Sequence, residues 1–297
     1  MDVSTQNQAV SLKALLNQKK LIVSPGIFDL VSLKIADQFD FPCLYMTGYG
    51  TVASYLGLPD AGLATYSDMV NRVQAFCSAT PTPIICDGDT GYGGLLNVAH
   101  TVDGYIRAGA AGIQLEDQQF PKKCGHTKGR RVIAAKDMAA KIRVAVDARA
   151  DRDDFLIIAR TDARTSLGLD EALRRADSYL QAGADVLFVE SPESREELEA
   201  IGRRFDVPLV VNIVEGGKTP QPSAQELEQM GFSLAIHPGL GFLAMGRALE
   251  SAYGQLKKTG DSVGYTDLAD FETFSKLMGF QKVWDFDDKY KDLENAR

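Results

Sequence analysis

The stretch LLNVAHTVDGYIRAGAAGIQLED, residues 95–117, decides the fold class. Apolar side chains recur with helical spacing over 95–108, and an Ala-Gly-Ala turn that suits a helix C-terminus follows. A short apolar run, 112–115, then ends in Glu116 and a second acid. Residues 182–190 repeat the same turn, apolar run and terminal acid. The repeat predicts strands that alternate with helices and end in acidic side chains.

Apolar runs of this kind recur along the chain, and most are followed by a stretch with helical spacing. The predicted strands are 21–24, 43–46, 83–86, 112–115, 155–159, 185–189, 208–211 and 233–236. The clearest predicted helices are 95–108, 135–148, 169–182 and 194–205. Nearly continuous apolar strands between helices predict a parallel sheet covered by helices. Because 297 residues suit one α/β barrel, we predict a single (β/α)₈ TIM-type barrel.

The predicted barrel occupies residues 1–260 and a C-terminal helical extension occupies 261–297. The extension is rich in aromatic side chains: Phe271, Phe274, Phe280, Trp284, Phe286 and Tyr290. These are too many aromatics for a free, solvated tail. We expect the extension to pack on the barrel or on a neighbouring subunit.

Composition excludes two classes of partner. The net charge of −8 and the pI near 5.0 argue against nucleic acid and anionic membranes, which both need a positive surface. No apolar run approaches the roughly 18 residues of a membrane span, and residues 1–20 lack the apolar core of a signal peptide. We expect a cytoplasmic protein.

Polar residues follow the predicted strands, at the end of a barrel where chemistry is located. In chain order they are Thr47, Asp87 with Asp89, Glu116 with Asp117, Arg160 with Asp162, Glu190, Asn212 with Glu215, and His237. Any one of them could simply cap the following helix. Their convergence on one face favours a functional site.

Two carboxylates on alternate residues, Asp87 and Asp89, precede glycines that allow a sharp turn. With Glu116 from the next strand they supply hard oxygen ligands, which suit Mg²⁺, with Mn²⁺ as an alternative. The competing interpretation is an Asx turn that binds no metal.

The sequence Pro-Lys-Lys-Cys-Gly-His, residues 121–126, lies in the long connection 117–133. Two ammonium groups and an imidazole near Cys124 lower the pKa of a thiol and permit proton transfer. Zinc is excluded, because the chain has three histidines and no further ligands near this loop. The other interpretation is a solvated basic loop over 122–131.

Arg160 has two interpretations as well. It could pair with Glu190 as a structural ion pair, or its planar guanidinium could bind a substrate carboxylate. The nearby lysines and the predicted metal favour an anionic substrate. The segment 215–219, EGGKT, lacks the full spacing of a phosphate loop, so nucleotide binding is not expected.

The motifs together resemble the isocitrate lyase/phosphoenolpyruvate mutase superfamily over nearly the whole chain. They are LGLPD at 56–60, DGDTGYGG at 87–94, LEDQ at 115–118, PKKCGH at 121–126, ARTDA at 159–163, and Asn212. The KKCGH segment is typical of the lyase branch, and 215–220, EGGKTP, is similar to that of 2-alkylmalate lyases.

The resemblance implies a role for each residue of the site. The metal ligands would be Asp87, Asp89 and Glu116, with Asp60 as an additional candidate. The substrate-binding residues would be Thr47, Gly48, Tyr49, Lys122, Gly125, Arg160 and Asn212. Cys124 would protonate the carbanion that forms on cleavage, Glu190 and His126 would organise its proton supply, and Tyr45 is a lesser candidate for the base.

The implied reaction is Mg²⁺-dependent cleavage of a 2-hydroxy dicarboxylate, a 2-alkylmalate such as 2,3-dimethylmalate or methylisocitrate, to a 2-oxo acid and a carboxylate. An oxaloacetate hydrolase on the same barrel is the nearest alternative. A catalytically silent carboxylate-binding barrel is the alternative from another class. Family members are typically homotetramers that exchange C-terminal helices, which would explain the aromatic extension.

Overall fold

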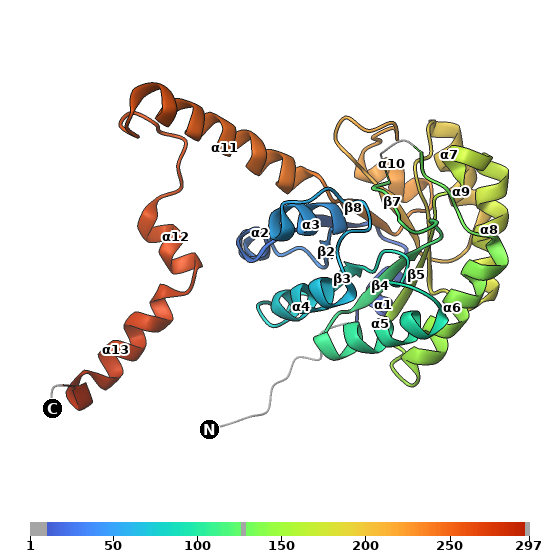
Figure 1. Ribbon diagram of the computed structural model, residues 1–297, viewed down its shortest axis with the longest axis horizontal. Helices are drawn as coiled ribbons and strands as arrows, with labels where there is room; N and C mark the ends of the chain where they lie inside the picture. The colour runs from blue at the N-terminus through green and yellow to red at the C-terminus, as the bar shows by residue number, and fades with distance from the viewer. Residues whose placement is uncertain (1–10, 126–128, 295–297) are drawn as a thin grey trace.

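The computed structural model describes residues 11–125 and 129–294. Eight parallel strands close into a barrel in chain order, and β8 pairs with β1 (Figure 1). The strands are β1 (Ile22–Ile27), β2 (Leu44–Met46), β3 (Ile84–Asp87), β4 (Gly112–Glu116), β5 (Leu156–Thr161), β6 (Val186–Val189), β7 (Leu209–Asn212) and β8 (Leu234–His237). The predicted (β/α)₈ barrel is therefore confirmed.

Helices from α2 to α10 cover the outside of the barrel (Figure 1). The helices of the described residues are α1 (Leu12–Leu16), α2 (Leu30–Ala36), α3 (Gly48–Leu56), α4 (Tyr66–Cys77), α5 (Leu95–Ala108), α6 (Ala135–Arg149), α7 (Arg164–Leu167), α8 (Leu169–Gln181), α9 (Arg195–Arg204), α10 (Ala224–Gln229), α11 (Leu240–Thr259), α12 (Phe271–Leu277) and α13 (Phe280–Glu294), with a 3₁₀ turn η1 (Asp37–Phe39). The connection after β2 contains α3. No helix of the described residues is long and apolar enough to cross a membrane.

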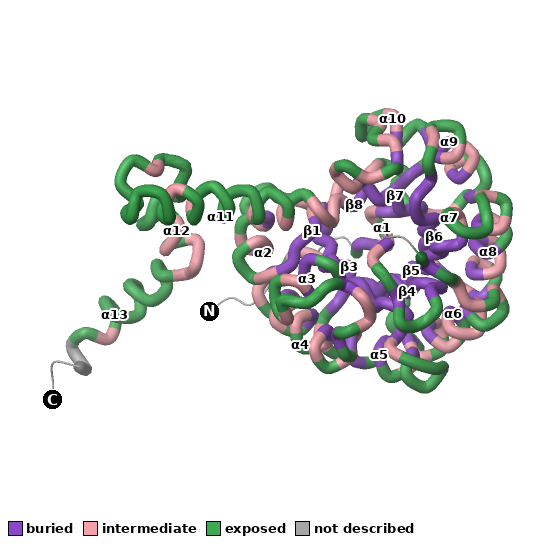
Figure 2. The backbone as a smooth tube through the Cα atoms, turned by 45° about the horizontal axis from the view of Figure 1, so that its top comes forward, coloured by how far each residue is buried: buried purple, intermediate pink, exposed green. Residues whose placement is uncertain are grey.

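The strands bury both faces, as their unbroken apolar sequences predicted (Figure 2). Successive side chains alternate between the barrel interior and the layer between strands and helices. On β5, Ile158 belongs to the interior cluster and Ile157 to the outer one. Leu12 and Leu16 of α1 join the interior cluster. The interior is thus a filled core, and the polar strand ends lie at its mouth.

Asp117, directly after β4, ties the mouth of the barrel to α8. Its buried carboxylate accepts hydrogen bonds from the Thr161 hydroxyl at 2.7 Å and the Asp162 amide at 2.8 Å. From α8 it also accepts hydrogen bonds from Arg175 at 3.0 Å and the Tyr179 hydroxyl at 2.8 Å. Although Asp117 stood among the polar strand ends, these four donors give it a structural role outside the cavity.

The C-terminal helices extend away from the barrel. Figures 1 and 2 show α11 leaving the barrel and α12 and α13 standing apart from it. Aromatic side chains remain exposed there, with Phe271 at 87%, Phe286 at 60% and Trp284 at 39%. Packing of the extension on its own barrel is therefore not observed. Packing on a neighbouring subunit stays a prediction.

We expect the protein to be a homo-oligomer in which these aromatic side chains are buried against another copy. Replacing Trp284 with Glu, beside the Phe280 ring at 6.1 Å, should shift the protein towards monomer in sedimentation velocity. Phe39→Glu, at an exposed aromatic residue of η1, serves as the control and should leave the oligomer intact. A monomeric wild-type protein would contradict this expectation.

Candidate active site

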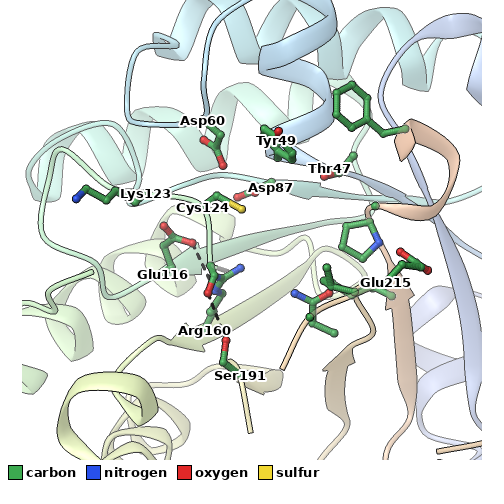
Figure 3. A pocket seen from close by; sticks show the side chains of 18 of the residues that line it. Thr47, Tyr49, Asp60, Asp87, Glu116, Lys123, Cys124, Arg160, Ser191 and Glu215 are labelled. Carbon is green, nitrogen blue, oxygen red and sulfur yellow. Dashed lines mark hydrogen bonds and ion pairs between the residues drawn. The ribbon is translucent and has the colours of Figure 1, made fainter. Parts of the chain in front are cut away.

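A cavity of about 610 Å³ opens at the carboxyl ends of the strands (Figure 3). Eleven of the predicted site residues line it: Tyr45, Thr47, Tyr49, Asp60, Asp87, Glu116, Lys122, Cys124, Gly125, Arg160 and Asn212. Gly48, Asp89 and Glu190 lie directly behind this lining, in contact with Asp87, Lys122 and Asn212 respectively. His126 lies outside the described residues. The tertiary structure therefore gathers residues from most of the strand ends around one space.

The turn after β3 places two carboxylates side by side. The Asp89 amide donates a hydrogen bond to Asp87 Oδ1 at 2.9 Å, which is the Asx turn considered from sequence. Asp89 itself adopts a left-handed backbone with φ of +48°, which is uncommon for a residue other than glycine. Asp87 Oδ2 lies so close to Gly48 that a side chain at position 48 would collide with it. The turn therefore fixes Asp87 without using its second oxygen.

The charges buried around the cavity do not balance. Among the described residues, six buried carboxylates face three buried cations, an excess of three negative charges. The carboxylates are Asp60, Asp87, Asp89, Glu116, Asp162 and Glu190, and the cations are Lys122, Arg130 and Arg160. Burial raises the pKa of Asp87 and Glu116, and it raises the pKa of Asp89 to about 7. The described residues of the site therefore carry an excess of negative charge.

A divalent cation suits this site in charge and in donor type. Glu116 Oε1 is buried and has no hydrogen-bond partner in the described part of the chain. The described residues, however, contain no group of three or more acidic, His or Cys side chains gathered around one point. Instead, the Lys122 ammonium lies 2.5 Å from both Asp60 and Asp89. The carboxylates fit a metal ion such as Mg²⁺, and Lys122 supplies part of the required positive charge.

Lys122 is held as a cation by these partners. Burial by itself would lower the pKa of the Lys122 ammonium, but Asp89 and Asp60 outweigh that effect and raise it well above its usual value. The side chain was expected to bind substrate. In this structure it binds carboxylates of the protein, while it still lines the cavity.

Arg160, from β5, connects the neighbouring strand ends. Its Nε and Nη2 each donate to the Asp162 carboxylate at 2.9 Å. Nη1 lies 3.4 Å from Glu190, and Nε lies 3.5 Å from Glu116. The predicted ion pair with Glu190 is thus present. Gly125 packs against Nη2 so closely that a larger residue would collide with it.

Glu190, at the end of β6, is fully buried and accepts two further hydrogen bonds. The Ser191 hydroxyl donates to it at 2.9 Å, and the Asn212 amide donates at 3.1 Å. The Ser191 hydroxyl is also within 3.3 Å of the Gly125 carbonyl. Glu190 therefore links Arg160 and Asn212, which both line the cavity, to the loop that carries Cys124.

Cys124 reaches the cavity from the loop after β4. Its backbone amide donates to the Asp60 carbonyl at 3.1 Å. The Gln118 side chain binds both the amide and the carbonyl of Lys123, at 3.0 Å and 2.8 Å. Figure 3 shows Cys124 and Asp87 in the same space between β3 and the loop. A solvated basic loop does not describe this segment, because Lys122 and Arg130 are buried.

Tyr45 is a hydrogen-bond donor in this site. Its hydroxyl donates to Gln114 Oε1 at 2.7 Å, and the Gln114 amide lies 3.5 Å from Asp87. Burial, followed by the nearby Asp87 carboxylate, raises the pKa of Tyr45 well above its usual value. The Tyr45 hydroxyl is therefore a hydrogen-bond donor in this structure, and its role as a lesser candidate for the base stays a prediction.

Sequence analysis missed Arg130. Its Nη1 binds Asp162 at 2.5 Å, and its Nη2 lies 2.7 Å from the Thr165 hydroxyl and 3.4 Å from the Ser191 hydroxyl. Asp162 is thereby clamped between two arginines, which lower its pKa although burial alone would raise it. Nothing in the local sequence Gly-Arg-Arg, 129–131, distinguishes the buried Arg130 from the exposed Arg131.

One wall of the cavity was missed as well. Residues from the ends of β7 and β8 and from the start of α11 form it: Val214, Glu215, Ile236, Pro238, Phe242 and Leu243. Sequence analysis had noted Glu215 as a polar residue after a strand and as the first residue of the segment 215–220, but had not placed it in the cavity. His237 does not line the cavity; its Nδ1 lies 3.7 Å from the Glu215 carboxylate.

Comparison with known proteins agrees with the fold. The family Phosphoenolpyruvate phosphomutase matches residues 12–257. The chain is 43% identical to 2,3-dimethylmalate lyase of Eubacterium barkeri over 96% of this chain and 98% of that protein. It is 41% identical to the chloroplastic carboxyvinyl-carboxyphosphonate phosphorylmutase of Arabidopsis thaliana, over 95% and 84%. An oxaloacetate acetylhydrolase structure in complex with 3,3-difluorooxalacetate matches with a TM-score of 0.90 and 37% identity, over 95% of this chain and 97% of that one.

The chain therefore belongs to the phosphoenolpyruvate mutase/isocitrate lyase superfamily. Within that superfamily it is a carbon–carbon lyase. The resemblance inferred from sequence motifs is confirmed.

Replacing Arg130 with Ala should lower the free energy of unfolding by roughly 3 to 5 kcal/mol, because a buried ion pair loses one partner. Without Arg130, Asp162 would be held by Arg160 alone, and Arg160 would be positioned less firmly for binding substrate. We therefore expect KM to rise more than kcat falls. Urea unfolding and steady-state kinetics measure both effects. Arg131→Ala, an exposed neighbour, is the matched control and should change stability by less than about 0.5 kcal/mol. Equal effects of the two substitutions would contradict the role of Arg130.

Proposed function

We propose that this protein is a Mg²⁺-dependent lyase that cleaves a small 2-hydroxy dicarboxylate to a 2-oxo acid and a carboxylate. The observation that supports this most directly is the excess of buried carboxylates beside Arg160 and Cys124 in one cavity. Such a site can hold a divalent cation, bind an anion and transfer a proton within one space. The similarity to 2,3-dimethylmalate lyase supports the same substrate class.

The oxo-acid end of the substrate would bind at the start of α3. Thr47, the N-cap residue of α3, makes no side-chain capping hydrogen bond, so the first amides of the helix are available for an anion. Gly48 and Tyr49 supply these amides. Arg160 would contribute a planar guanidinium to the same carboxylate group.

The second carboxylate would bind on the other side of Arg160. Asn212 and Gly125 are proposed to bind it: the Asn212 amide donates to Glu190, and the Gly125 carbonyl accepts from Ser191. His126, outside the described residues, is proposed to join them. Because Glu190 binds Arg160 and Asn212 together, it is proposed to fix the distance between the two carboxylate sites.

Asp87 would hold the cation, with Asp89 and Glu116 assisting directly or through water and Asp60 as an additional candidate. Mg²⁺ is proposed, with Mn²⁺ as an alternative, because the donors are hard oxygens. The ion, when bound, acts as a Lewis acid that lowers the pKa of a substrate hydroxyl. The buried carboxylates otherwise repel an anionic substrate, so Mg²⁺ also makes binding electrostatically favourable.

The reaction needs one proton removed from the substrate hydroxyl and one delivered to carbon. Cleavage of the C2–C3 bond leaves its electron pair on C3, where the Cys124 thiol would donate a proton. Water has to be kept away from this carbanion-like species. The loop that carries Cys124 is bound to Asp60 on one side and, through Gly125, to Ser191 on the other.

A second candidate function is hydrolysis of oxaloacetate, in which water attacks the carbonyl carbon before the carbon–carbon bond breaks. The structural similarity to oxaloacetate acetylhydrolase, with a TM-score of 0.90, favours it. An assay with Mg²⁺ on 2-methylmalate, 2,3-dimethylmalate, methylisocitrate, isocitrate and oxaloacetate separates the candidates. A 2-oxo acid from an alkylmalate supports the lyase, and oxalate alone supports the hydrolase. If none of the substrates gives a product, the result supports a catalytically silent, carboxylate-binding barrel.

Replacing Cys124 with Ser should reduce kcat by about 10²-fold or more, because the hydroxyl is a much weaker acid than the thiol. The thermal midpoint of unfolding and Mg²⁺ binding should change little. Cys77→Ser is the matched control, because Cys77 is half-buried at the end of α4 and does not line the cavity. Near-normal turnover of the Cys124 variant would remove this thiol from the mechanism.

Replacing Asp87 with Asn should weaken Mg²⁺ binding measured by calorimetry, because the amide removes the charge of the central ligand. EDTA should abolish turnover by the wild-type enzyme, and Mg²⁺ should restore it. Asp103→Asn, on the exposed face of α5, controls for a general change in charge. Unchanged Mg²⁺ affinity in the Asp87 variant would assign the metal to other residues.

A further inference from the structure

A buried tyrosine of α5 reaches the main chain of Asp87 from outside the barrel. The Tyr105 side chain is fully buried in the layer between strands and helices. Its hydroxyl donates a hydrogen bond to the Asp87 carbonyl oxygen at 3.0 Å. Tyr105 does not line the cavity, so its contact with the site runs through the backbone of Asp87.

The Asp87 carbonyl lies where the pairing of β2 with β3 ends. The last paired residue of β2 is Met46, opposite Cys86, so Asp87 is one residue beyond this ladder. A buried carbonyl at the end of a ladder needs a donor from elsewhere, because an unpaired polar group is costly in the interior. The Tyr105 hydroxyl is such a donor, and it therefore replaces a ladder hydrogen bond with a side-chain one.

The peptide group that joins Asp87 to Gly88 is held on both sides. Its carbonyl accepts from Tyr105, and its amide donates to the Gln114 carbonyl of β4 at 2.9 Å. The backbone also packs closely here, since a side-chain carbon at Gly88 would lie 2.6 Å from Ile113. Of these contacts, the hydrogen bond from Tyr105 is the one that a single side-chain substitution can remove.

A second tyrosine supports this hydrogen bond. The hydroxyl oxygens of Tyr92 and Tyr105 lie 3.2 Å apart. A phenol has one proton to donate, and that of Tyr105 is used by Asp87, so the Tyr92 hydroxyl is the donor in this pair. The Tyr92 ring makes an edge contact with the ring of Tyr66, at the start of α4. Because hydrogen bonds in a chain polarise one another, Tyr92 makes Tyr105 a stronger donor.

The exact position of Asp87 matters for the ion that is proposed to bind there. Mg²⁺ requires nearly ideal octahedral geometry, with oxygen ligands at about 2.0 to 2.1 Å, so it tolerates little displacement of a ligand. The Asp89 amide holds one carboxylate oxygen of Asp87, and the contacts of its peptide group hold the main chain. Hydrogen bonds that orient a metal ligand commonly change metal affinity by about 10- to 100-fold.

We propose that Tyr105 is a positioning residue for the metal site: its hydroxyl, supported by Tyr92, fixes the main chain of Asp87 in the orientation that Mg²⁺ requires. This inference rests on the proposed role of Asp87 as the metal ligand. It adds to the site a residue of α5 that contacts neither the ion nor the substrate.

The test measures Mg²⁺ binding by calorimetry in the absence of substrate. Tyr105→Phe removes one oxygen and keeps the ring, and it should raise the Kd for Mg²⁺ about tenfold. Tyr179→Phe is the matched control, because the Tyr179 hydroxyl is equally buried but donates to Asp117, outside the cavity. Both variants should lose thermal stability, but the control should keep its Kd for Mg²⁺ within about twofold of the wild-type value.

Steady-state kinetics separates positioning from a general loss of structure. In Tyr105→Phe the Mg²⁺ concentration that gives half-maximal activity should rise about tenfold. At saturating Mg²⁺, kcat should stay within about threefold of the wild-type value, because no residue that contacts the substrate has changed. A merely structural role would lower the thermal midpoint of unfolding and leave the Mg²⁺ dependence as it is in the wild type.

Tyr92→Phe is the second variant if Tyr105→Phe does not fold. It keeps the hydrogen bond from Tyr105 to Asp87 and removes the supporting donor, so the Kd for Mg²⁺ should rise about threefold. Wild-type Mg²⁺ affinity in folded Tyr105→Phe, or in Tyr92→Phe where that is the variant measured, would overturn this inference while the proposed lyase function stands. If the wild-type protein binds no Mg²⁺ and EDTA does not affect its turnover, the proposed metal site fails, and this inference fails with it.

Discussion

The ion pairs of Arg160 hold the strand ends together at the mouth of the barrel. From β5 its guanidinium binds Asp162 in the next loop and approaches Glu116 at the end of β4 and Glu190 at the end of β6. Glu190 in turn accepts a hydrogen bond from Asn212 on β7. Four consecutive strand ends are thus connected through one cation. Removing a partner from such a buried network leaves uncompensated charge, which costs several kcal/mol in proteins.

The same network explains why the site suits a cation and an anionic substrate together. Burying more carboxylates than cations is unfavourable for the protein alone, and raised pKa values of Asp87, Asp89 and Glu116 reflect that cost. A divalent ion would offset the excess and create a place for a dianion. Functional sites commonly retain such locally unfavourable arrangements because the rest of the fold stabilises them. Here Asp117 accepts four hydrogen bonds, from the end of β5, from the Asp162 amide directly after it and from two side chains of α8. These bonds fix the backbone of Asp162, which binds Arg160.

The two ends of the cavity differ in side-chain chemistry. Charged side chains from β3 to β6 form the end that we assign to chemistry, and they are fixed by ion pairs and hydrogen bonds. The opposite wall comes from the ends of β7 and β8 and the start of α11, and its Phe242 ring contacts the rings of Phe28 and Tyr49. Because the two ends use different elements, substrate preference can change in this architecture without disturbing the residues that break the bond.

Much of this protein was determined by its sequence alone. The apolar runs located all eight strands, because strands buried on both faces need continuous hydrocarbon, and the polar residues after them located the mouth of the barrel. Only the tertiary structure showed which cationic side chains are buried and which carboxylates they bind. Arg130 is buried and Arg131 exposed, Lys122 binds protein carboxylates, and Asp117 faces α8. The cavity wall that β7, β8 and α11 form around Glu215 also became visible only in three dimensions. Local sequence shows how buried positions repeat along a helix or strand. The ion-pair partner of a charged side chain, in contrast, often lies tens of positions away in the chain, and only folding brings the two together.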